Sequence, residues 1–277
     1  MERQRPALRR RVRSRGGRSG RAPTLVRPQR VLGLTPPPAV AWEPVGEAGI
    51  YLKQLELGPM QNFVYLIGDP VARECVVVDP AWEIDTIVDT AQADGMRLTG
   101  ALVTHTHQDH VGGSLASWGM PGRIPGVEEL LTRLPLKVYV HKAEREFLPG
   151  LGSDLVKVDN HDTLPIGRLA LTFLHTPGHT PGSQCFLVDD RLVSGDTLFI
   201  GSCGRTDLPG SDPSEMYYSL TRRLGALPDN TLLFPGHNYG GPSSTLGEEK
   251  RHNPFMRFAS LGEFLRVMGG GGRVTLS

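Results

Sequence analysis

The segment 104–110 constrains this chain more than any other part of its sequence. It reads Thr-His-Thr-His-Gln-Asp-His and directly follows a short apolar run with strand character. Side chains alternate along an extended chain, so His105 and His107 can project their imidazoles to the same side. Asp109 and His110 follow where the strand turns into a loop, and they can face a second point nearby. Neutral imidazoles and carboxylates are ligands of zinc and iron, so the segment predicts a metal site.

Three further turns carry candidate ligands. His179 lies in a turn framed by proline and glycine. It is a better ligand candidate than His175, which we expect to be a hydrogen-bonded residue at a strand end. Asp196 ends a short strand, where a carboxylate can bridge two metals. His237 follows Phe-Pro-Gly after another strand-like run. Each turn alone is a weak signal, so the prediction depends on all of them together.

The rest of the chain alternates between short β-type runs and helical patterns, with frequent turn signals. We expect strands at 50–57, 62–67, 75–78, 98–103, 138–140, 155–158, 169–174, 184–188, 192–194 and 231–234. We expect helices at 83–93, 127–133, 142–147, 213–224 and 261–268. Strands predominate and helices intervene, which predicts an α/β protein with two sheets covered by helices, a sandwich.

The two ends of the chain differ from its body. Residues 1–30 hold 11 of the 30 Lys and Arg residues but one of the 29 Asp and Glu residues. We therefore expect a disordered basic tail over 1–46, a catalytic domain over 47–268 and a frayed end over 269–277. The tail is interpreted as a solvated extension. A mitochondrial transit peptide and a contact with RNA or anionic lipid are the alternatives.

Composition excludes several classes of protein. No apolar run approaches the roughly 20 residues that span a bilayer. Residues 31–277 carry 19 basic and 28 acidic side chains, a balance that does not suggest nucleic-acid binding. The three cysteines, Cys75, Cys185 and Cys203, are too widely spaced for a disulfide framework or a cysteine-based zinc site. A reducing compartment is the simpler interpretation.

The four motifs together resemble the metallo-β-lactamase superfamily over about residues 48–255. They read Thr-His-x-His-x-Asp-His, Pro-Gly-His-Thr-Pro-Gly, Gly-Asp-Thr and Pro-Gly-His. The resemblance implies a four-layer αβ/βα sandwich with a metal centre at one edge. It also implies that one metal is held by His105, His107 and His179, that the other is held by Asp109, His110 and His237, and that Asp196 bridges them.

Within this superfamily the chain looks closest to the glyoxalase II-like and persulfide dioxygenase-like branch. The run Cys-Gly-Arg-Thr-Asp at 203–207 and the segment 243–254 carry this likeness. The chain does not look like a drug-degrading β-lactamase, and it lacks the large insertions of nucleic-acid-cleaving members. Forty residues follow His237, too few for the helical domain with which glyoxalase II grips glutathione.

Two functions follow from the resemblance. In the first, a thioester hydrolase of the glyoxalase II type, two metals generate a bridging hydroxide that attacks the thioester carbonyl. Asp196 would hold the metals together, and Asp109 could also orient the hydroxide. In the alternative, His105, His179 and Asp196 hold one Fe²⁺, and glutathione persulfide is oxidised toward sulfite. The complete set of seven ligands favours the hydrolase, whereas the 203–207 run favours the dioxygenase.

Other residues receive roles by the same resemblance. Asp79 resembles the carboxylate that hydrogen-bonds a ligand imidazole, with a simple Asp-Pro turn as the alternative. Arg205 could pair with a substrate carboxylate or bridge two loops. Cys203 is expected to be packed rather than catalytic. The segment 114–135 looks like an extra loop and helix. It either shapes the entrance to the substrate site or is a surface addition with no role in that site.

For the hydrolase we expect two divalent ions as cofactor, with Zn²⁺ as the first choice and Fe²⁺ or Mn²⁺ as alternatives. The dioxygenase would hold one Fe²⁺. The expected partner is a small-molecule thioester or a glutathione-derived substrate, with no nucleic acid and no membrane. A homodimer is one assembly that this interpretation allows. We expect a cytoplasmic protein, or a mitochondrial one if the basic start is a transit peptide.

Overall fold

Two six-stranded sheets form the centre of the fold in a computed structural model, which describes residues 49–144 and 154–269. The first sheet has the order β1-β2-β3-β4-β7-β8, and its strands from β3 onward run parallel to one another. Its strands are β1 Tyr51–Leu57, β2 Asn62–Asp69, β3 Glu74–Val78, β4 Arg97–Leu102, β7 Lys137–His141 and β8 Leu155–Val158.

The second sheet has the order β16-β15-β12-β11-β10-β9. It is mainly antiparallel, but β12 and β15 pair in parallel. Its strands are β9 Thr163–Ile166, β10 Leu169–His175, β11 Gln184–Val188, β12 Arg191–Gly195, β15 Leu232–Pro235 and β16 Ser244–Thr245. Two short pairs stand apart from the sheets: β5 Gly113–Ser114 with β6 Arg123–Ile124, and β13 Leu198–Phe199 with β14 Ser202–Cys203.

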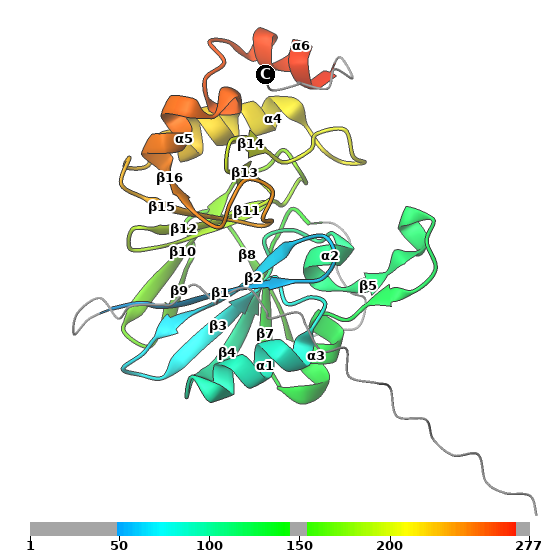
Figure 1. Cartoon of the computed structure of the whole chain (residues 1–277), viewed down its shortest axis with the longest axis vertical. Helices are drawn as coiled ribbons and strands as arrows, with labels where there is room; N and C mark the ends of the chain where they lie inside the picture. The colour runs from blue at the N-terminus through cyan, green and yellow to red at the C-terminus, as the bar shows by residue number, and fades with distance from the viewer. Residues whose placement is uncertain (1–48, 145–153, 270–277) are drawn as a thin grey trace, which may run out of the picture. The chain divides into compact units, whose positions relative to one another are not determined.

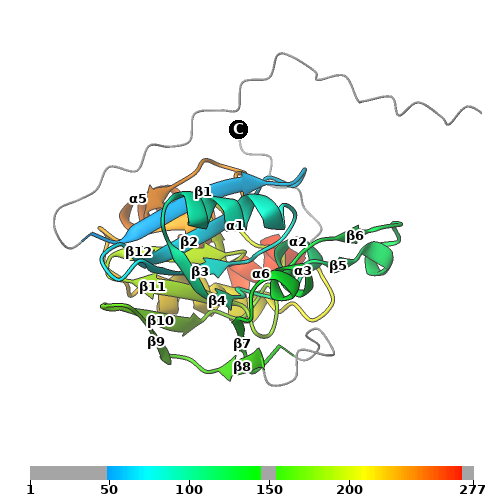
Figure 2. The ribbon, with the colours of Figure 1, turned by 90° about the horizontal axis from the view of Figure 1, so that it is seen from below.

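Apart from α2 and the helical turn η1, the helices lie on the outer side of the two sheets (Figures 1 and 2). The α-helices are α1 Ile84–Ala93, α2 Gln108–Val111, α3 Val127–Arg133, α4 Pro213–Tyr218, α5 Leu246–His252 and α6 Leu261–Gly269. Shorter helical turns are η1 Leu115–Trp118 and η4 Pro254–Met256, and η3 Ser219–Leu224 continues α4 as a π-helix. None of the helices in the described ranges is long and apolar enough to cross a membrane.

Strand β2 shows how the sequence produces these layers. All eight of its residues are buried, because both faces of the first sheet are covered. Val64 and Leu66 point into the cluster that contains the apolar faces of α1 and α3. Phe63 and Ile67, on the opposite face, pack in the cluster between the two sheets. A third cluster joins the second sheet to α4, η3, α5 and α6. The expected four-layer αβ/βα sandwich is therefore confirmed.

The two sheets are joined at the edge where β4, β12 and β15 end. The backbone amide of Phe63 donates to the carbonyl of Gly236 at 2.8 Å, and that of Gln184 donates to the carbonyl of Thr104 at 2.9 Å. Gly195 turns the chain with a φ of +50°, and an added Cβ there would lie 2.6 Å from the Thr104 side chain. Glycine is therefore required where the ends of β4 and β12 approach each other.

Three local expectations need correction. The described part of the predicted helix 142–147 is a turn at 142–143, and residues 145–147 lie outside the described residues. Strand β9 and helix α5 were not predicted. Thr245 explains the start of α5, because its hydroxyl accepts a hydrogen bond from the Glu248 amide as an N-cap. The segments 1–46 and 270–277 lie outside the described residues, and Gly269 is the last residue of α6.

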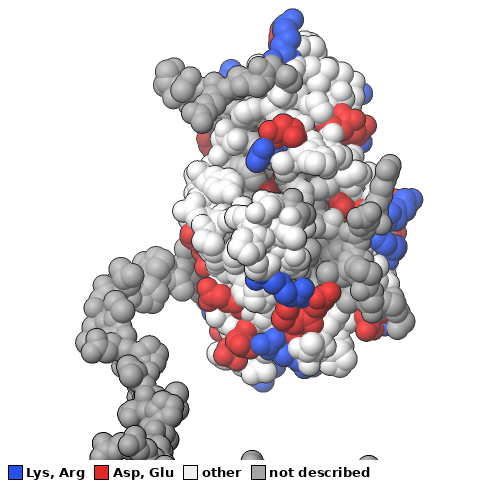
Figure 3. Space-filling model, turned by 90° about the vertical axis from the view of Figure 1, so that its right-hand side faces the viewer, with Lys and Arg blue, Asp and Glu red and all other residues white. Residues whose placement is uncertain are grey.

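The segment 114–135 divides into two parts. Helix α3 buries Val127 and Leu130 in the layer that covers the first sheet, so this part belongs to the core. The β5–β6 hairpin instead extends away from the sandwich in both ribbon views (Figures 1 and 2). Acidic and basic side chains lie side by side on the face shown in Figure 3. Arg123, at the base of the hairpin, pairs with Glu128 and Glu129.

Tyr65 supplies a testable link between the sheets. Its buried hydroxyl donates to the carbonyl of Pro235 at 2.5 Å, and it accepts from the Gln54 amide at 2.9 Å. We expect Tyr65→Phe to lower the free energy of unfolding by about 1–2 kcal/mol, because it removes both hydrogen bonds inside the sandwich. Tyr139→Phe is the control, with an expected change below about 0.5 kcal/mol. Equal urea midpoints for Tyr65→Phe and the wild type would contradict this account.

Candidate metal centre

All the predicted ligands lie on turns that follow the carboxyl ends of strands. His105 and His107 follow β4, and Asp109 and His110 lie in the one-turn helix α2. The other three ligands follow β10, β12 and β15, and they are His179, Asp196 and His237. These four strands end at the same side of the sandwich, so His105 and His237, 132 positions apart in the sequence, lie in one place. The sequence predicted this convergence.

Three imidazoles form the first group of ligands. The Nδ1 atom of His107 lies 3.0 Å from Nε2 of His105 and 3.0 Å from Nε2 of His179. The three rings are nearly perpendicular to one another, with centroids 4.7 Å apart. His105 and His179 are buried, and His107 is half-buried. Their nitrogen atoms therefore converge on one point, as ligands of a single metal ion do.

The second group consists of one carboxylate and two imidazoles. The Nε2 atoms of His110 and His237 are 3.2 Å apart, and Oδ2 of Asp109 lies 3.4 Å from each of them. All three residues are buried. The predicted division of six ligands into two groups of three is thus present in the geometry.

Asp196 lies between the two groups. Its Oδ2 is 3.6 Å from Nε2 of His179 and 3.5 Å from Nε2 of His237, and its Oδ1 is 3.3 Å from Nε2 of His110. Oδ1 is buried, and no described residue gives it a hydrogen bond. A buried carboxylate oxygen without a donor is costly unless a cation balances it, so the residues present fit a metal ion. Gly236 permits this approach, since a Cβ there would lie 2.5 Å from Oδ1.

Four of the five imidazoles are oriented from behind by oxygen atoms. Carbonyl and carboxylate oxygens can only accept, and the Thr104 hydroxyl already donates to Asp79, so each of these Nδ1 atoms carries a proton and each Nε2 atom faces inward. The pairs are His105 with Thr104 Oγ1 at 3.0 Å, His110 with Asp79 Oδ2 at 2.9 Å, His179 with the Arg205 carbonyl at 2.8 Å, and His237 with the Met60 carbonyl at 2.9 Å.

Asp79 has the geometry expected of the supporting carboxylate. Besides His110, it accepts from the backbone amide of Thr104 at 2.7 Å and from the Thr104 hydroxyl at 2.6 Å. Its φ of +52° lies in the left-handed region, which aspartate adopts more readily than most residues, and the three hydrogen bonds fix its carboxylate there. The contact with a ligand imidazole goes beyond what a simple Asp-Pro turn requires.

The two groups differ in electrostatics. Burial and the neighbouring imidazoles lower the pKa of His105, and they lower that of His107 to about 4. Burial opposes the charged form of His110 and His237 too, but Asp109 and Asp196 raise the pKa of His110 to about 9 and that of His237 to about 10. His105 and His107 are therefore neutral near pH 7, whereas the pair His110 and His237 is protonated, and a metal must displace that proton.

Comparison with known proteins shows which family has this fold and this arrangement of motifs. The family model described as the metallo-beta-lactamase superfamily matches residues 57–237. This chain belongs to the metallo-β-lactamase superfamily. Its relatives include the mitochondrial persulfide dioxygenase ETHE1 of Homo sapiens, which is 33% identical over 80% of this chain and 82% of the relative.

Two other members of the superfamily illustrate the range of relatives. The probable polyketide biosynthesis zinc-dependent hydrolase PksB of Bacillus subtilis is 31% identical over 71% of this chain and 82% of the relative. The crystal structure of ETHE1 from Myxococcus xanthus is 31% identical and superposes with a TM-score of 0.66, covering 82% of this chain and 92% of that chain. The branch suspected from the sequence is therefore confirmed, and the superfamily includes both hydrolases and dioxygenases.

The loop at 203–207 supports the centre in an unexpected way. The side chain of Arg205 is exposed and forms a two-pronged ion pair with Asp207, at 2.8 and 2.9 Å. Its backbone carbonyl, rather than its side chain, holds His179. The role of the Arg205 side chain in substrate binding stays a prediction. Cys203 is buried, and burial raises the pKa of its thiol to about 12, so it is unsuited to act as a nucleophile.

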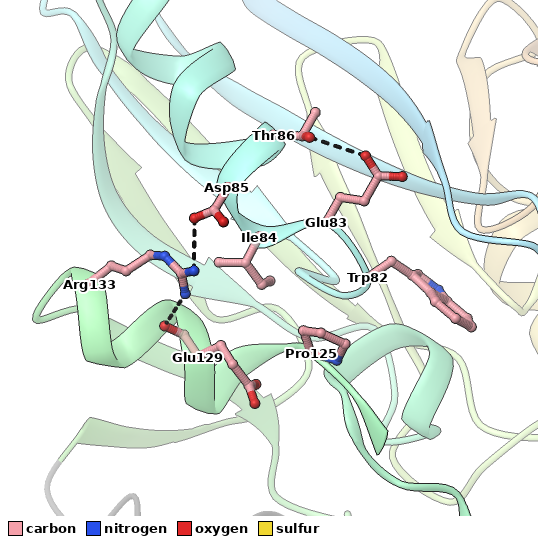
Figure 4. A pocket seen from close by; sticks show the side chains of 8 residues that line it. All are labelled: Trp82, Glu83, Ile84, Asp85, Thr86, Pro125, Glu129 and Arg133. Carbon is pink, nitrogen blue, oxygen red and sulfur yellow. Dashed lines mark hydrogen bonds and ion pairs between the residues drawn. The ribbon is translucent and has the colours of Figure 1, made fainter. Parts of the chain in front are cut away.

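Sequence reasoning missed a support for Asp109. The amide of Asn62 donates to Asp109 Oδ2 and to the Asp109 carbonyl, both at 3.1 Å. Asn62 in turn accepts from the indole of Trp82 at 3.1 Å. Trp82 borders a hollow of about 350 Å³ between α1 and α3, and the seven predicted ligands are not part of its lining (Figure 4). Asn62 begins an ordinary strand pattern, so nothing in the sequence marked it.

The outer rim of the centre was also not predicted. The ring of Tyr239 stacks on the imidazole of His237, with centroids 4.6 Å apart and an interplanar angle of 9°. Phe199 contacts both rings edge-on. Met60, whose carbonyl holds His237, and Tyr239 are exposed. Two aromatic rings therefore border His237, and the ring of Tyr239 is exposed to solvent.

The difference in protonation leads to a prediction. At pH 6 the pair His110 and His237 holds at least one proton that metal binding must release, because the pKa of each imidazole lies above that pH. We expect Zn²⁺ binding to metal-free protein at pH 6 to release at least one proton per chain. Calorimetric titration in buffers of different ionisation enthalpy measures this number. His175→Ala should leave it unchanged, and zinc binding without proton release would contradict the assignment.

Proposed function

We propose that this chain is a persulfide dioxygenase that oxidises glutathione persulfide. One persulfide, one O₂ and one water give the free thiol, sulfite and two protons; the terminal sulfur is oxidised and O₂ is reduced. The observation that carries the proposal is the likeness to human persulfide dioxygenase across four fifths of both chains. The run Cys-Gly-Arg-Thr-Asp lies directly against the ligand His179, which adds support from this chain's own geometry.

The residues at the centre fit the iron that such a reaction uses. His105, His179 and Asp196 would hold it, and two imidazoles with one carboxylate are a set that suits non-haem iron. When bound, ferrous iron supplies open positions for oxygen chemistry. Thr104 and the Arg205 carbonyl keep the Nε2 atoms of the two imidazoles directed inward. Phe199 and Tyr239 present apolar surface at the rim and would limit the access of water.

Arg205 is the candidate that would bind the carboxylate of a glutathione-derived substrate. Its guanidinium is 68% exposed, and its ion pair with Asp207 is equally open to solvent. An exposed ion pair of this kind contributes little stability, so exchanging Asp207 for a substrate carboxylate costs little. The planar guanidinium can then form a bidentate pair with that carboxylate.

A second candidate function, hydrolysis of a thioester, rests on the completeness of the second group. Asp109, His110 and His237 would hold a second ion, and Asp196 faces both groups. Two ions at such a centre can lower the pKa of a water and stabilise an oxyanion. The likeness to a zinc-dependent hydrolase of Bacillus subtilis supports this candidate. Asp109 could orient the attacking water from its position beside His237.

Two substitutions distinguish the candidates. In a dioxygenase, His237→Ala should keep persulfide-dependent oxygen uptake within about threefold of the wild type, because His237 would not hold the iron. Asp196→Ala should abolish that uptake, since it removes one of three ligands. In a hydrolase, both substitutions should lower thioester hydrolysis by about 100-fold or more. An oxygen electrode and a thioester assay on the same samples make the comparison.

His175→Ala is the matched control, because His175 is an imidazole at the end of β10 that bonds the Pro181 carbonyl instead of facing the centre. We expect it to retain activity in whichever assay the wild type shows. Loss of oxygen uptake in both His237→Ala and Asp196→Ala, with thioester hydrolysis in the wild type, would overturn the proposed dioxygenase in favour of the hydrolase.

A further inference from the structure

Glu144 is a buried carboxylate that the ligand assignment does not use. It lies in the turn after β7, where its backbone amide donates to the His141 carbonyl at 3.1 Å. The residue is only 6% exposed. Lys157 donates to its backbone carbonyl at 3.1 Å, but no described Lys or Arg forms an ion pair with its carboxylate. Burying a carboxylate without a cation is costly unless its oxygens accept hydrogen bonds. Its hydrogen-bond partners therefore indicate what the side chain does.

Among the described residues, both hydrogen-bond donors to the Glu144 carboxylate belong to ligand-bearing turns. The hydroxyl of Thr106 donates to Oε2 at 2.7 Å, and the hydroxyl of Thr180 donates to Oε1. Thr106 is the residue between His105 and His107, and Thr180 directly follows His179. One turn leaves the first sheet and the other leaves the second sheet. A single carboxylate thus connects the two chain segments that supply the first group of imidazoles.

The surroundings of Glu144 hold it in this position. Gly182 packs against it so closely that an added Cβ would lie 2.5 Å from Cγ and 2.7 Å from the backbone nitrogen of Glu144. Ser183 accepts from the backbone amide of Thr180 at 2.9 Å, which fixes the far side of the same turn. The carboxylate, both hydroxyls and the Thr180 turn therefore form one network with little freedom to rearrange.

We propose that Glu144 is a positioning residue for the metal centre. By joining Thr106 to Thr180, it keeps the nitrogen atoms of His105, His107 and His179 converged before a metal binds. Supports of this kind, which touch a ligand's neighbours rather than the metal, contribute substantially to metal affinity. The inference goes beyond the proposed function, because His105 and His179 are ligands in both the dioxygenase and the hydrolase.

The test measures metal affinity rather than turnover. Metal-free, full-length protein is titrated with Co²⁺ in competition with a chelator, and its absorption spectrum reports the ligand geometry. We expect Glu144→Ala to weaken the tightest Co²⁺ site by about 10–100-fold. Glu144→Gln should recover part of this loss, since its amide oxygen can still accept from one threonine. The thermal midpoint of each metal-free variant shows whether it remains folded.

Glu249→Ala is the matched control. Glu249 is equally buried, at 4% exposed, and its carboxylate accepts from the Gly201 amide at 2.8 Å and from the Asn253 amide at 2.9 Å. None of its partners adjoins His105, His107 or His179. This substitution should lower the thermal midpoint while the Co²⁺ affinity of the folded protein stays within about threefold of the wild type, as expected for a support remote from the ligands.

A double-mutant cycle tests the connection itself. If Glu144 acts through Thr180, the affinity losses of Glu144→Ala and Thr180→Val should not add, because either change breaks the same link. Wild-type Co²⁺ affinity in folded Glu144→Ala, or an equal loss in Glu249→Ala, would overturn the role of Glu144. Fully additive losses would overturn it as well. A wild-type protein that binds no Co²⁺ would instead overturn the metal centre and both candidate functions.

Discussion

The close approach of the two sheets at one edge is the constraint on which the rest of the structure depends. Backbone hydrogen bonds from Phe63 to Gly236 and from Gln184 to Thr104 fix this approach. Strand β4 of the first sheet and strands β12 and β15 of the second sheet end there. The turns that follow these strands therefore lie within a few ångströms of one another. The apolar layers bury the strands, and the polar groups gather where the strands stop. The metal centre is a consequence of this geometry.

The centre concentrates polar groups that a sandwich core would otherwise exclude. Nε2 atoms face inward, and the buried Oδ1 of Asp196 accepts no hydrogen bond from a described residue, so these groups are available to a metal ion. Oxygen atoms behind four of the five imidazoles orient those rings before any metal binds. Metal binding must then displace the proton held by the pair His110 and His237, which couples affinity to pH. Glu144, as proposed, extends this support to the turns themselves.

Features that depend on neighbouring residues can be predicted from the sequence, whereas features that depend on distant contacts cannot. The His-x-His segment, the strand runs and the helix at 127–133 depend on local pattern, so the sequence predicts them well. The described part of the predicted helix at 142–147 is a turn at 142–143, and the Glu144 that follows it reaches the ligand turns. Contacts made by backbone atoms, such as the Arg205 carbonyl on His179, have no side-chain signature. Asn62 and Glu144 acquire their roles only through partners distant in the sequence.

The most direct test of the account is a metal count joined to an activity measurement on one sample. Protein purified without oxygen should contain about one iron per chain and consume O₂ when glutathione persulfide is added, with sulfite as the product. Elemental analysis and an oxygen electrode give both numbers. About two zinc ions per chain, no persulfide-dependent oxygen uptake and rapid thioester hydrolysis would contradict the proposed dioxygenase.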